Sequence, residues 1–185
     1  MKSQSSLDFF SSKNNSMLPD YFSLAVSCSK LGTNITMQVF TEEVTTKHMK
    51  DVSRLLKIYL PTILESTCFN TKNLSFDKEV THTELGHLFE HILLEYLCKE
   101  KIRSGSNEAV FKGVTKWNWN KDTFGTFHIQ IDVPHAEKDL LYFALEQSVL
   151  LLKRIIHYHA SWPSYPDITQ KPLQLSSYKP EKQMA

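Results

Sequence analysis

The chain has 185 residues, of which 41% are hydrophobic, and its 21 basic and 20 acidic side chains leave a formal net charge of +1. This length and composition fit one globular domain with a substantial core. The near-neutral charge argues against a nucleic-acid partner or an anionic membrane surface, and no run of apolar residues is long enough to predict a membrane span. Three widely spaced cysteines without a CxxC pair favour free thiols in a reducing cytoplasm, so we expect a cytoplasmic protein.

Composition divides the chain into three parts. Residues 1–18 are rich in Ser, Asn and Lys, and we expect them to form a flexible arm. Residues 161–185 carry four prolines among polar side chains and are expected to be an extended or disordered tail. The domain itself then occupies residues 19–160, in which we find neither a linker nor an internal repeat.

The domain begins with two predicted strands. Residues 21–31 alternate apolar with small or polar side chains, and residues 35–39 continue this period of two after a turn at residues 32–34. We expect these segments to form an antiparallel hairpin. Residues 46–59 then place apolar side chains at helical spacing and predict a helix, whereas residues 65–79 are polar and irregular.

In the second half of the domain, a helix is followed by two strands and a final helix. Residues 83–101 predict a helix with Thr83 as its N-cap, and two strands follow at about 109–117 and 125–133. A long amphipathic helix is expected over residues 136–159. This order predicts an α+β fold: a single-domain sandwich of an antiparallel or mixed sheet packed with three main helices.

The helix over residues 83–101 carries an unusual group of titratable side chains. His87, His91 and Glu95 lie one turn apart along one face, and Glu90 lies beside them. Apolar residues occupy most of the remaining circumference, which is typical of a buried helix. Burying four titratable groups together is unfavourable unless something compensates them, and a divalent cation does so. We therefore predict a metal site, with zinc as the first choice and another divalent metal as the alternative.

The spacing of this group matches a known catalytic pattern. Two histidines four residues apart on a helix can bind one ion, and HxxEH is the inverse of the HExxH of zinc peptidases. Glu90 then occupies the place of the general base, because zinc lowers the pKa of its bound water to roughly 7 and a carboxylate can accept the proton. The other interpretation is that His87 and His91 are core histidines satisfied by neighbouring glutamates.

Spacing leaves the third ligand open. Glu95 lies on the face of the histidines but one turn beyond the second of them, Glu84 precedes the first by three residues, and Glu146 could approach from the last helix. Downstream, residues 111–120 combine basic, aromatic and amide side chains. Thr115, Lys116 and Trp117 could bind a substrate there, since a tryptophan face can bind a guanidinium group. The alternative is an exposed hairpin whose tryptophans pack on the edge of the sheet.

Two segments give the chain a family resemblance. The stretch from Thr83 to Leu97, TELGHLFEHILLEYL, resembles a helix in the N-terminal domain of cyanophycin synthetases, where the pattern H-L-x-E-H-x-A-L-E-L recurs. The segment Gly113-Val-Thr115-Lys116 is similar to the G-x-T-[KR] that follows in that family, before a strand rich in valine or isoleucine and a long helix. The likeness covers roughly residues 21–159, and only these two segments are specific.

Cyanophycin synthetases polymerise aspartate and arginine with two further ATP-dependent domains, so this chain would be a free-standing relative of their N-terminal domain. The resemblance implies binding of an arginine-bearing polymer and, as in some members of the family, metal-dependent hydrolysis of it. His87, Glu90, His91 and Glu95 all match the motif, and the resemblance therefore favours Glu95 as the third ligand.

Together these features predict a zinc-dependent hydrolase that cleaves amide bonds of a peptide-like substrate, with cyanophycin or a related Asp/Arg polymer as a candidate. Glu90 is the predicted catalytic residue, and His87, His91 and Glu95 are the predicted metal ligands. The alternative is a non-catalytic module that binds an arginine-rich polymer or a partner protein. The oligomeric state stays open, with a homodimer among the options.

Overall fold

A computed structural model describes residues 8–10, 18–68 and 75–161 of the chain. The helices are α1 (Val52–Tyr59), α2 (Phe76–Glu79), α3 (Leu85–Arg103) and α4 (Lys138–Ser161), with the short 3₁₀ helices η1 (Ile63–Glu65) and η2 (His135–Glu137). The strands are β1 (Asp8–Phe10), β2 (Phe22–Cys28), β3 (Thr33–Val39), β4 (Gly113–Lys116) and β5 (Thr126–Ile131). The predicted α+β class, with one sheet and three main helices, is confirmed.

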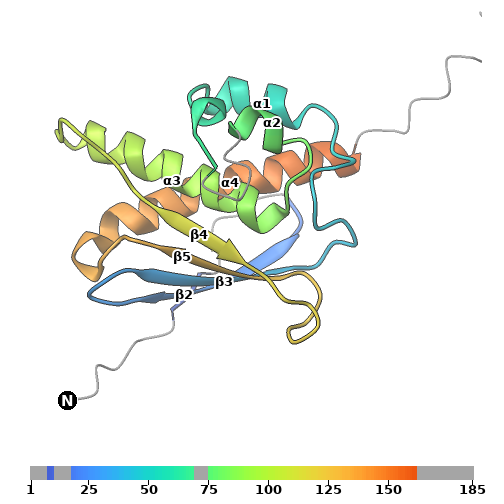
Figure 1. The fold of residues 1–185 in the computed structure, drawn as a ribbon, viewed down its shortest axis with the longest axis horizontal. Helices are drawn as coiled ribbons and strands as arrows, with labels where there is room; N and C mark the ends of the chain where they lie inside the picture. The colour runs from blue at the N-terminus through green and yellow to red at the C-terminus, as the bar shows by residue number, and fades with distance from the viewer. Residues whose placement is uncertain (1–7, 11–17, 69–74, 162–185) are drawn as a thin grey trace, which may run out of the picture.

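All five strands belong to one antiparallel sheet with the order β1-β2-β3-β5-β4. The helices lie together on one side of this sheet, and the other side carries no helix (Figure 1). Strand β4 is therefore an edge strand, paired with β5 alone. It is also the strand that lies nearest to α3 at that edge (Figure 1).

The predicted hairpin is confirmed as β2 and β3, in which Phe22 pairs with Val39 and Cys28 with Thr33. Its turn lies earlier than the expected residues 32–34. The Ser29 hydroxyl and the Ser29 N–H both donate to the Gly32 carbonyl at 2.8 Å, so the chain reverses before Thr33, which already belongs to β3.

Several predicted boundaries are corrected by contacts between distant segments. The helix expected from residue 46 starts only at Val52, because the Thr46 N–H donates to the Thr83 carbonyl at 2.8 Å instead of entering a helix. The strand expected over 109–117 is shortened to β4, which is as far as its pairing with β5 extends. The irregular stretch 65–79 contains the short helix α2, and the expected flexible arm contains β1. The tail at 162–185 lies outside the described residues.

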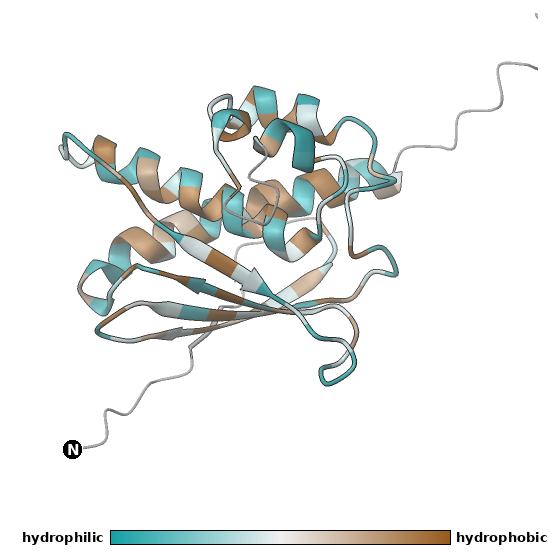
Figure 2. Ribbon diagram, viewed as in Figure 1, coloured by the Kyte–Doolittle hydropathy of each residue, from teal (hydrophilic) through white to brown (hydrophobic). Residues whose placement is uncertain are grey.

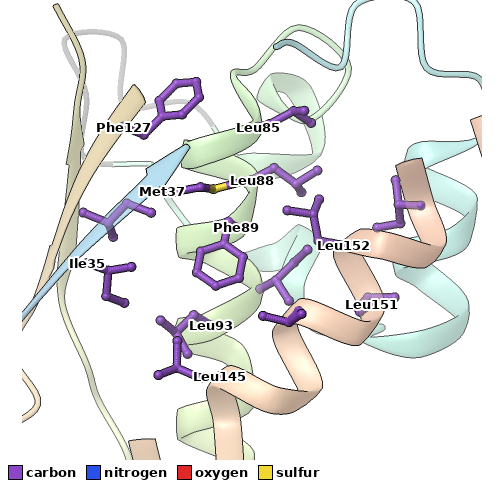
Figure 3. Packing of buried hydrophobic residues seen from close by; sticks show 14 of the residues in the cluster. Ile35, Met37, Leu85, Leu88, Phe89, Leu93, Phe127, Leu145, Leu151 and Leu152 are labelled. Carbon is purple, nitrogen blue, oxygen red and sulfur yellow. The ribbon is translucent and has the colours of Figure 1, made fainter. Parts of the chain in front are cut away.

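Helix α3 occupies the centre of the molecule. Phe89 and Leu93 lie between Ile35 and Met37 of the sheet and the leucines of α4 (Figure 3). Close approach to β5 requires Gly86, because a Cβ atom there would lie 2.4 Å from the Phe127 ring. With the sheet below, α4 beside it and α1, η1 and α2 above, α3 is enclosed on most sides, which explains its lack of a single apolar face (Figures 1 and 2).

Long apolar stretches are interrupted by polar residues in the two long helices, α3 and α4 (Figure 2). Within the described part of the chain, no helix combines the length and apolar character that crossing a membrane requires.

Candidate metal centre

His87 and His91 lie one turn apart on the side of α3 that faces η1 and α2. Their ring centroids are 4.8 Å apart. Phe76, the first residue of α2, stacks on the His91 ring with a centroid distance of 3.9 Å and an interplanar angle of 10°. The phenyl ring covers one face of the imidazole and keeps water from it, so His91 is only 8% exposed.

A third possible metal ligand comes from a segment far from α3 in the sequence. Cys68 follows η1, is 2% exposed, and places its Sγ 3.4 Å from His91 Nε2. One ligand atom from each of Cys68, His87 and His91 lies within 4.8 Å of the other two. These are distances at which one ion can bind all three, since zinc binds sulfur at roughly 2.3 Å and imidazole nitrogen at roughly 2.0 Å.

Hydrogen bonds fix the His91 ring in the tautomer that a metal needs. The Ser66 hydroxyl donates to the Ile63 carbonyl at 2.7 Å, so its hydrogen is already used. Ser66 Oγ lies 3.1 Å from His91 Nδ1 and must therefore accept the hydrogen that this nitrogen carries. The lone pair of His91 is left on Nε2, the nitrogen that faces Cys68.

His87 is held in a similar way. Its Nδ1 lies 2.7 Å from the Thr83 hydroxyl, and Nε2 is the ring nitrogen that this hydroxyl does not contact. We had expected Thr83 to cap the helix, but Glu84 holds the N-cap position and the Thr83 side chain contacts the histidine instead. Both histidines thus have a hydroxyl partner on Nδ1, and a partner on the second ring nitrogen is what orients a metal-binding histidine.

Burial makes both imidazoles neutral at physiological pH. It lowers the pKa of His91 to about 3, with a further contribution from the neighbouring His87, and it lowers the pKa of His87 as well. Burial, together with the negative charges of Glu79 and Glu90, raises the pKa of the Cys68 thiol to about 11. A divalent cation would reverse this last effect, because a thiol that binds a metal ion loses its proton.

Glu79, the last residue of α2, adds a negative charge beside the cluster. Its carboxylate raises the pKa of both His87 and Cys68. Its Oε1 atom is buried, and no described residue forms a hydrogen bond with it. A buried carboxylate oxygen without a partner is unfavourable, and a nearby cation would satisfy it. The residues at this site therefore fit a bound divalent metal.

Glu90, the residue before His91 on α3, faces β4. It is 5% exposed and accepts a hydrogen bond of 2.5 Å from the Thr115 hydroxyl. A Cβ atom on Gly113 would lie 2.7 Å from Glu90 Oε1, so the glycine leaves the space that the carboxylate occupies. Burial raises the pKa of Glu90, and the hydrogen bond from Thr115 partly opposes this. A carboxylate with a raised pKa is a better proton acceptor near neutral pH.

One cavity of about 670 Å³ connects Glu90 with the three-residue cluster. Glu90, Cys68, His87 and His91 all line it, as does the segment 111–115 leading into and along β4. The size is within the range of pockets that bind small molecules or a few residues of a polymer.

The other predicted ligands take different positions. Glu95 lines the same cavity, but it lies outside the group of three whose ligand atoms converge, and its carboxylate accepts a short hydrogen bond from Thr62. Glu84 lines the cavity as the N-cap of α3. Glu146 lies on α4 and is not among the residues that line the cavity.

The predicted substrate-binding residues do not all face the cavity, because successive side chains of β4 point to opposite faces of the sheet. Thr115 faces α3 and contacts Glu90, and Trp117 lines the cavity while packing edge-on against the Phe127 ring at 6.0 Å. Lys116 is exposed and does not line this cavity. It borders a shallow depression with Trp117 and His128 instead.

The donor set indicates which metals suit the site. One thiolate and two imidazoles are a soft and borderline set that favours zinc over magnesium or calcium. Three protein ligands leave one position open in a tetrahedral site, which is typical of catalytic zinc.

Three contributors to the site were missed in the sequence: Cys68, Ser66 and Glu79. All lie in or beside the stretch that we expected to be irregular, and none has a fixed spacing from the HxxEH pattern. The one usable signal was a single cysteine 19 residues before His87, in a chain with a histidine pair. Comparisons with protein-family models and with curated proteins find no match to this chain.

Proposed function

We propose that the protein is a zinc-dependent hydrolase that cleaves amide bonds of a peptide-like substrate. The observation that carries the proposal is the convergence of Cys68, His87 and His91 in a cavity that Glu90 also lines. A set of three ligands with an open position and a buried carboxylate nearby is the arrangement that metal-assisted hydrolysis needs.

Each residue would have a defined part in the reaction. Zinc, when bound to Cys68, His87 and His91, would lower the pKa of water and polarise the scissile carbonyl group. Glu90 would accept the proton of the attacking water and return it to the nitrogen of the leaving amine. Thr115 would hold the Glu90 carboxylate in place through the hydrogen bond that it donates.

The charges around the cavity support a substrate with cationic groups. Besides Glu90, the lining includes Glu79, Glu84 and Glu95, and among the described lining residues the one lysine or arginine is Lys112. An acidic lining of this kind favours guanidinium or ammonium groups. It agrees with the resemblance to the N-terminal domain of cyanophycin synthetases, and an arginine-bearing polymer such as cyanophycin therefore remains our preferred substrate class.

The test is to incubate the purified protein with cyanophycin and, separately, with ordinary peptides, and to measure new amino termini. We expect release of amino termini that a chelator stops and added zinc restores. Glu90→Gln should retain zinc and lose hydrolysis by about a hundredfold or more, because it removes the general base. Glu108→Gln, an exposed glutamate outside the cavity, is the matched control and should keep full activity.

One observation favours a second function, a non-catalytic binding module with a structural ion. Glu79, whose Oε1 is unpartnered, lines the same cavity outside the converging group of three, and a shift of its side chain toward the ion would supply a fourth ligand. Sites with four protein ligands are structural. In that case the protein would retain zinc and bind the polymer without releasing amino termini, and Glu79→Gln would weaken zinc binding. Protein that binds no zinc at all would contradict both functions.

A further inference from the structure

The edge of β4 that faces away from β5 has a direct connection to the metal centre. Thr115 of this strand donates its hydroxyl to Glu90, and the Gly113 backbone leaves room for the same carboxylate. Glu90 in turn immediately precedes His91 on α3. The strand therefore runs along the side of the cavity on which the proposed general base lies.

The pairing of β4 with β5 determines which of its main-chain groups point outward. The Asp132 N–H donates to the Lys112 carbonyl at 3.0 Å, which makes these two residues a hydrogen-bonded pair of the antiparallel ladder. Since such pairs alternate along a ladder, Val114 and Lys116 direct their N–H and C=O groups toward β5. Gly113 and Thr115 direct theirs away from it.

These outward-pointing main-chain groups are available for hydrogen bonding within the described part of the chain. No described residue forms a hydrogen bond with the N–H or C=O of Gly113 or Thr115. The cavity is lined by every residue from 111 to 115, although their side chains alternate between the two faces of the sheet. Contact with consecutive residues is expected where a cavity borders the backbone edge of a strand.

We propose that the free edge of β4 binds the main chain of an extended peptide as an added strand, and so guides it along the cavity past Glu90. Exposed strand edges bind peptides in this way elsewhere, with main-chain hydrogen bonds supplying affinity and side-chain pockets supplying specificity. The inference rests on the proposed function, because it takes the peptide bound at the edge to be the substrate. Because the charged side chains around the cavity are mainly acidic, we propose that the bound peptide contains basic residues.

The geometry of an added strand makes a sharp test available. In an extended peptide, alternate residues present their N–H groups to opposite edges. Only one of these two sets of peptide N–H groups can therefore form hydrogen bonds with Gly113 and Thr115. The probe is the acetylated peptide (Thr-Arg)₄, together with two isomers in which either all threonine nitrogens or all arginine nitrogens are methylated.

We expect one methylated isomer to bind the purified protein about tenfold or more weakly than the parent peptide, and the other to bind with unchanged affinity. Amide exchange by NMR should locate the contact. The Gly113 and Thr115 amides should slow by about tenfold when the parent peptide saturates the protein, whereas Val114 and Lys116 should change little because they already pair with β5.

Equal binding of all three peptides, or no change in exchange at Gly113 and Thr115, would overturn the proposal. So would protection of these two amides in the peptide-free protein, because the edge would then be occupied by a second copy or by the rest of the chain. Dilution distinguishes a second copy from the rest of the chain, since protection by a second copy becomes weaker as the protein is diluted.

Cleavage of the peptide is measured in the same samples. Pairing without cleavage would leave the added strand standing and overturn the claim that the bound peptide is a substrate, whereas cleavage without pairing would support the hydrolase and overturn the added strand.

Discussion

The two long helices α3 and α4 lie against the same sheet, and both bury polar side chains (Figure 1). In α4, each buried polar group has a partner within the protein. The Ser148 hydroxyl donates to the Ala144 carbonyl at 2.6 Å, and Lys153 donates to Asp20 at 2.6 Å. Neither group lines the large cavity.

In α3, the buried polar groups are oriented differently. Ser66 and Thr83 occupy the Nδ1 atoms of His91 and His87, so that the other nitrogens are left to face Cys68 and the cavity. Burial of polar groups is common to both helices and does not by itself indicate a site. What distinguishes α3 is that one ring nitrogen of each histidine and the Cys68 sulfur converge on one shared space.

The largest expected effect comes from removing the metal or one of its ligands. If zinc is present at about a thousand times its dissociation constant, it contributes about 4 kcal/mol to the free energy of unfolding. A chelator should therefore lower the stability of the wild type by about this amount, measured by urea unfolding. His91→Ala should lose the zinc, measured by elemental analysis, and should no longer respond to the chelator.

His128→Ala is the matched control for this experiment. His128 is exposed and pairs with Asp122, away from the large cavity. The variant should retain zinc and the full response to the chelator. If wild-type protein contains no zinc and its stability does not change with the chelator, the buried polar groups of α3 have no role different from those of α4. His87 and His91 are then ordinary core residues.

A second prediction concerns the acid sensitivity of the metal-free protein. His91 has a pKa of about 3 in the folded state and an ordinary value of 6.5 in the unfolded chain. Between these values the unfolded chain takes up a proton that the folded protein does not, so stability is fully present above pH 6.5 and decreases as the pH falls toward 3. The slope from this residue is roughly 1 kcal/mol per pH unit.

Urea unfolding between pH 7 and pH 4 in the presence of a chelator measures this slope. His91→Asn removes the titrating group and should give a shallower dependence than the wild type. The α4 variant Lys153→Met leaves His91 in place and should keep the wild-type slope. Equal slopes for all three proteins would mean that His91 is not buried in its neutral form.

Most of the strands and helices, and part of the candidate site, could be predicted from the sequence. The period of two in β2, β3 and β5 and the helical spacing in α3 and α4 placed these elements within a few residues of their observed bounds. Burial against a common core imposes these periods, and they can therefore be read without a structure. The HxxEH spacing likewise placed His87 and His91 on one face of α3.

What the sequence did not reveal depends on contacts between distant segments. Cys68 reaches the histidines because η1 and α2 fold back over α3, a reversal that no local pattern marks. The late start of α1 has the same origin, since Thr46 pairs with Thr83. Glu95 fitted the spacing of the motif but lies one turn too far along the helix to join the group that Cys68 completes.

A third prediction tests whether the hydroxyl partners orient the histidines. Thr83→Val keeps the shape of the side chain and removes the hydroxyl that contacts His87 Nδ1. Loss of such a partner weakens metal binding by about tenfold to a hundredfold. A competition titration with a chromogenic chelator measures the change in zinc affinity.

Thr33→Val provides the control for Thr83→Val. The Thr33 hydroxyl is equally buried and donates to the Val133 carbonyl at 2.8 Å, but it lies outside the cavity. This variant should lose about 1 kcal/mol of stability and keep its zinc affinity. Equal zinc affinities in the two variants would show that Thr83 supports the fold and does not orient His87.

The smallest effect is expected in α4 itself. Lys153 is 4% exposed, and its partner Asp20 has a side chain that is 82% exposed, so the pair is open to water at one end. Lys153→Met keeps the length of the side chain and removes the buried charge. Replacing a buried ion pair with apolar groups is often neutral or stabilising, so the free energy of unfolding should change by no more than about 1 kcal/mol and zinc affinity should not change. A loss of 3 kcal/mol or more would mean that the ion pair fixes the start of β2 against α4, and that α4 uses its buried polar group to specify the fold.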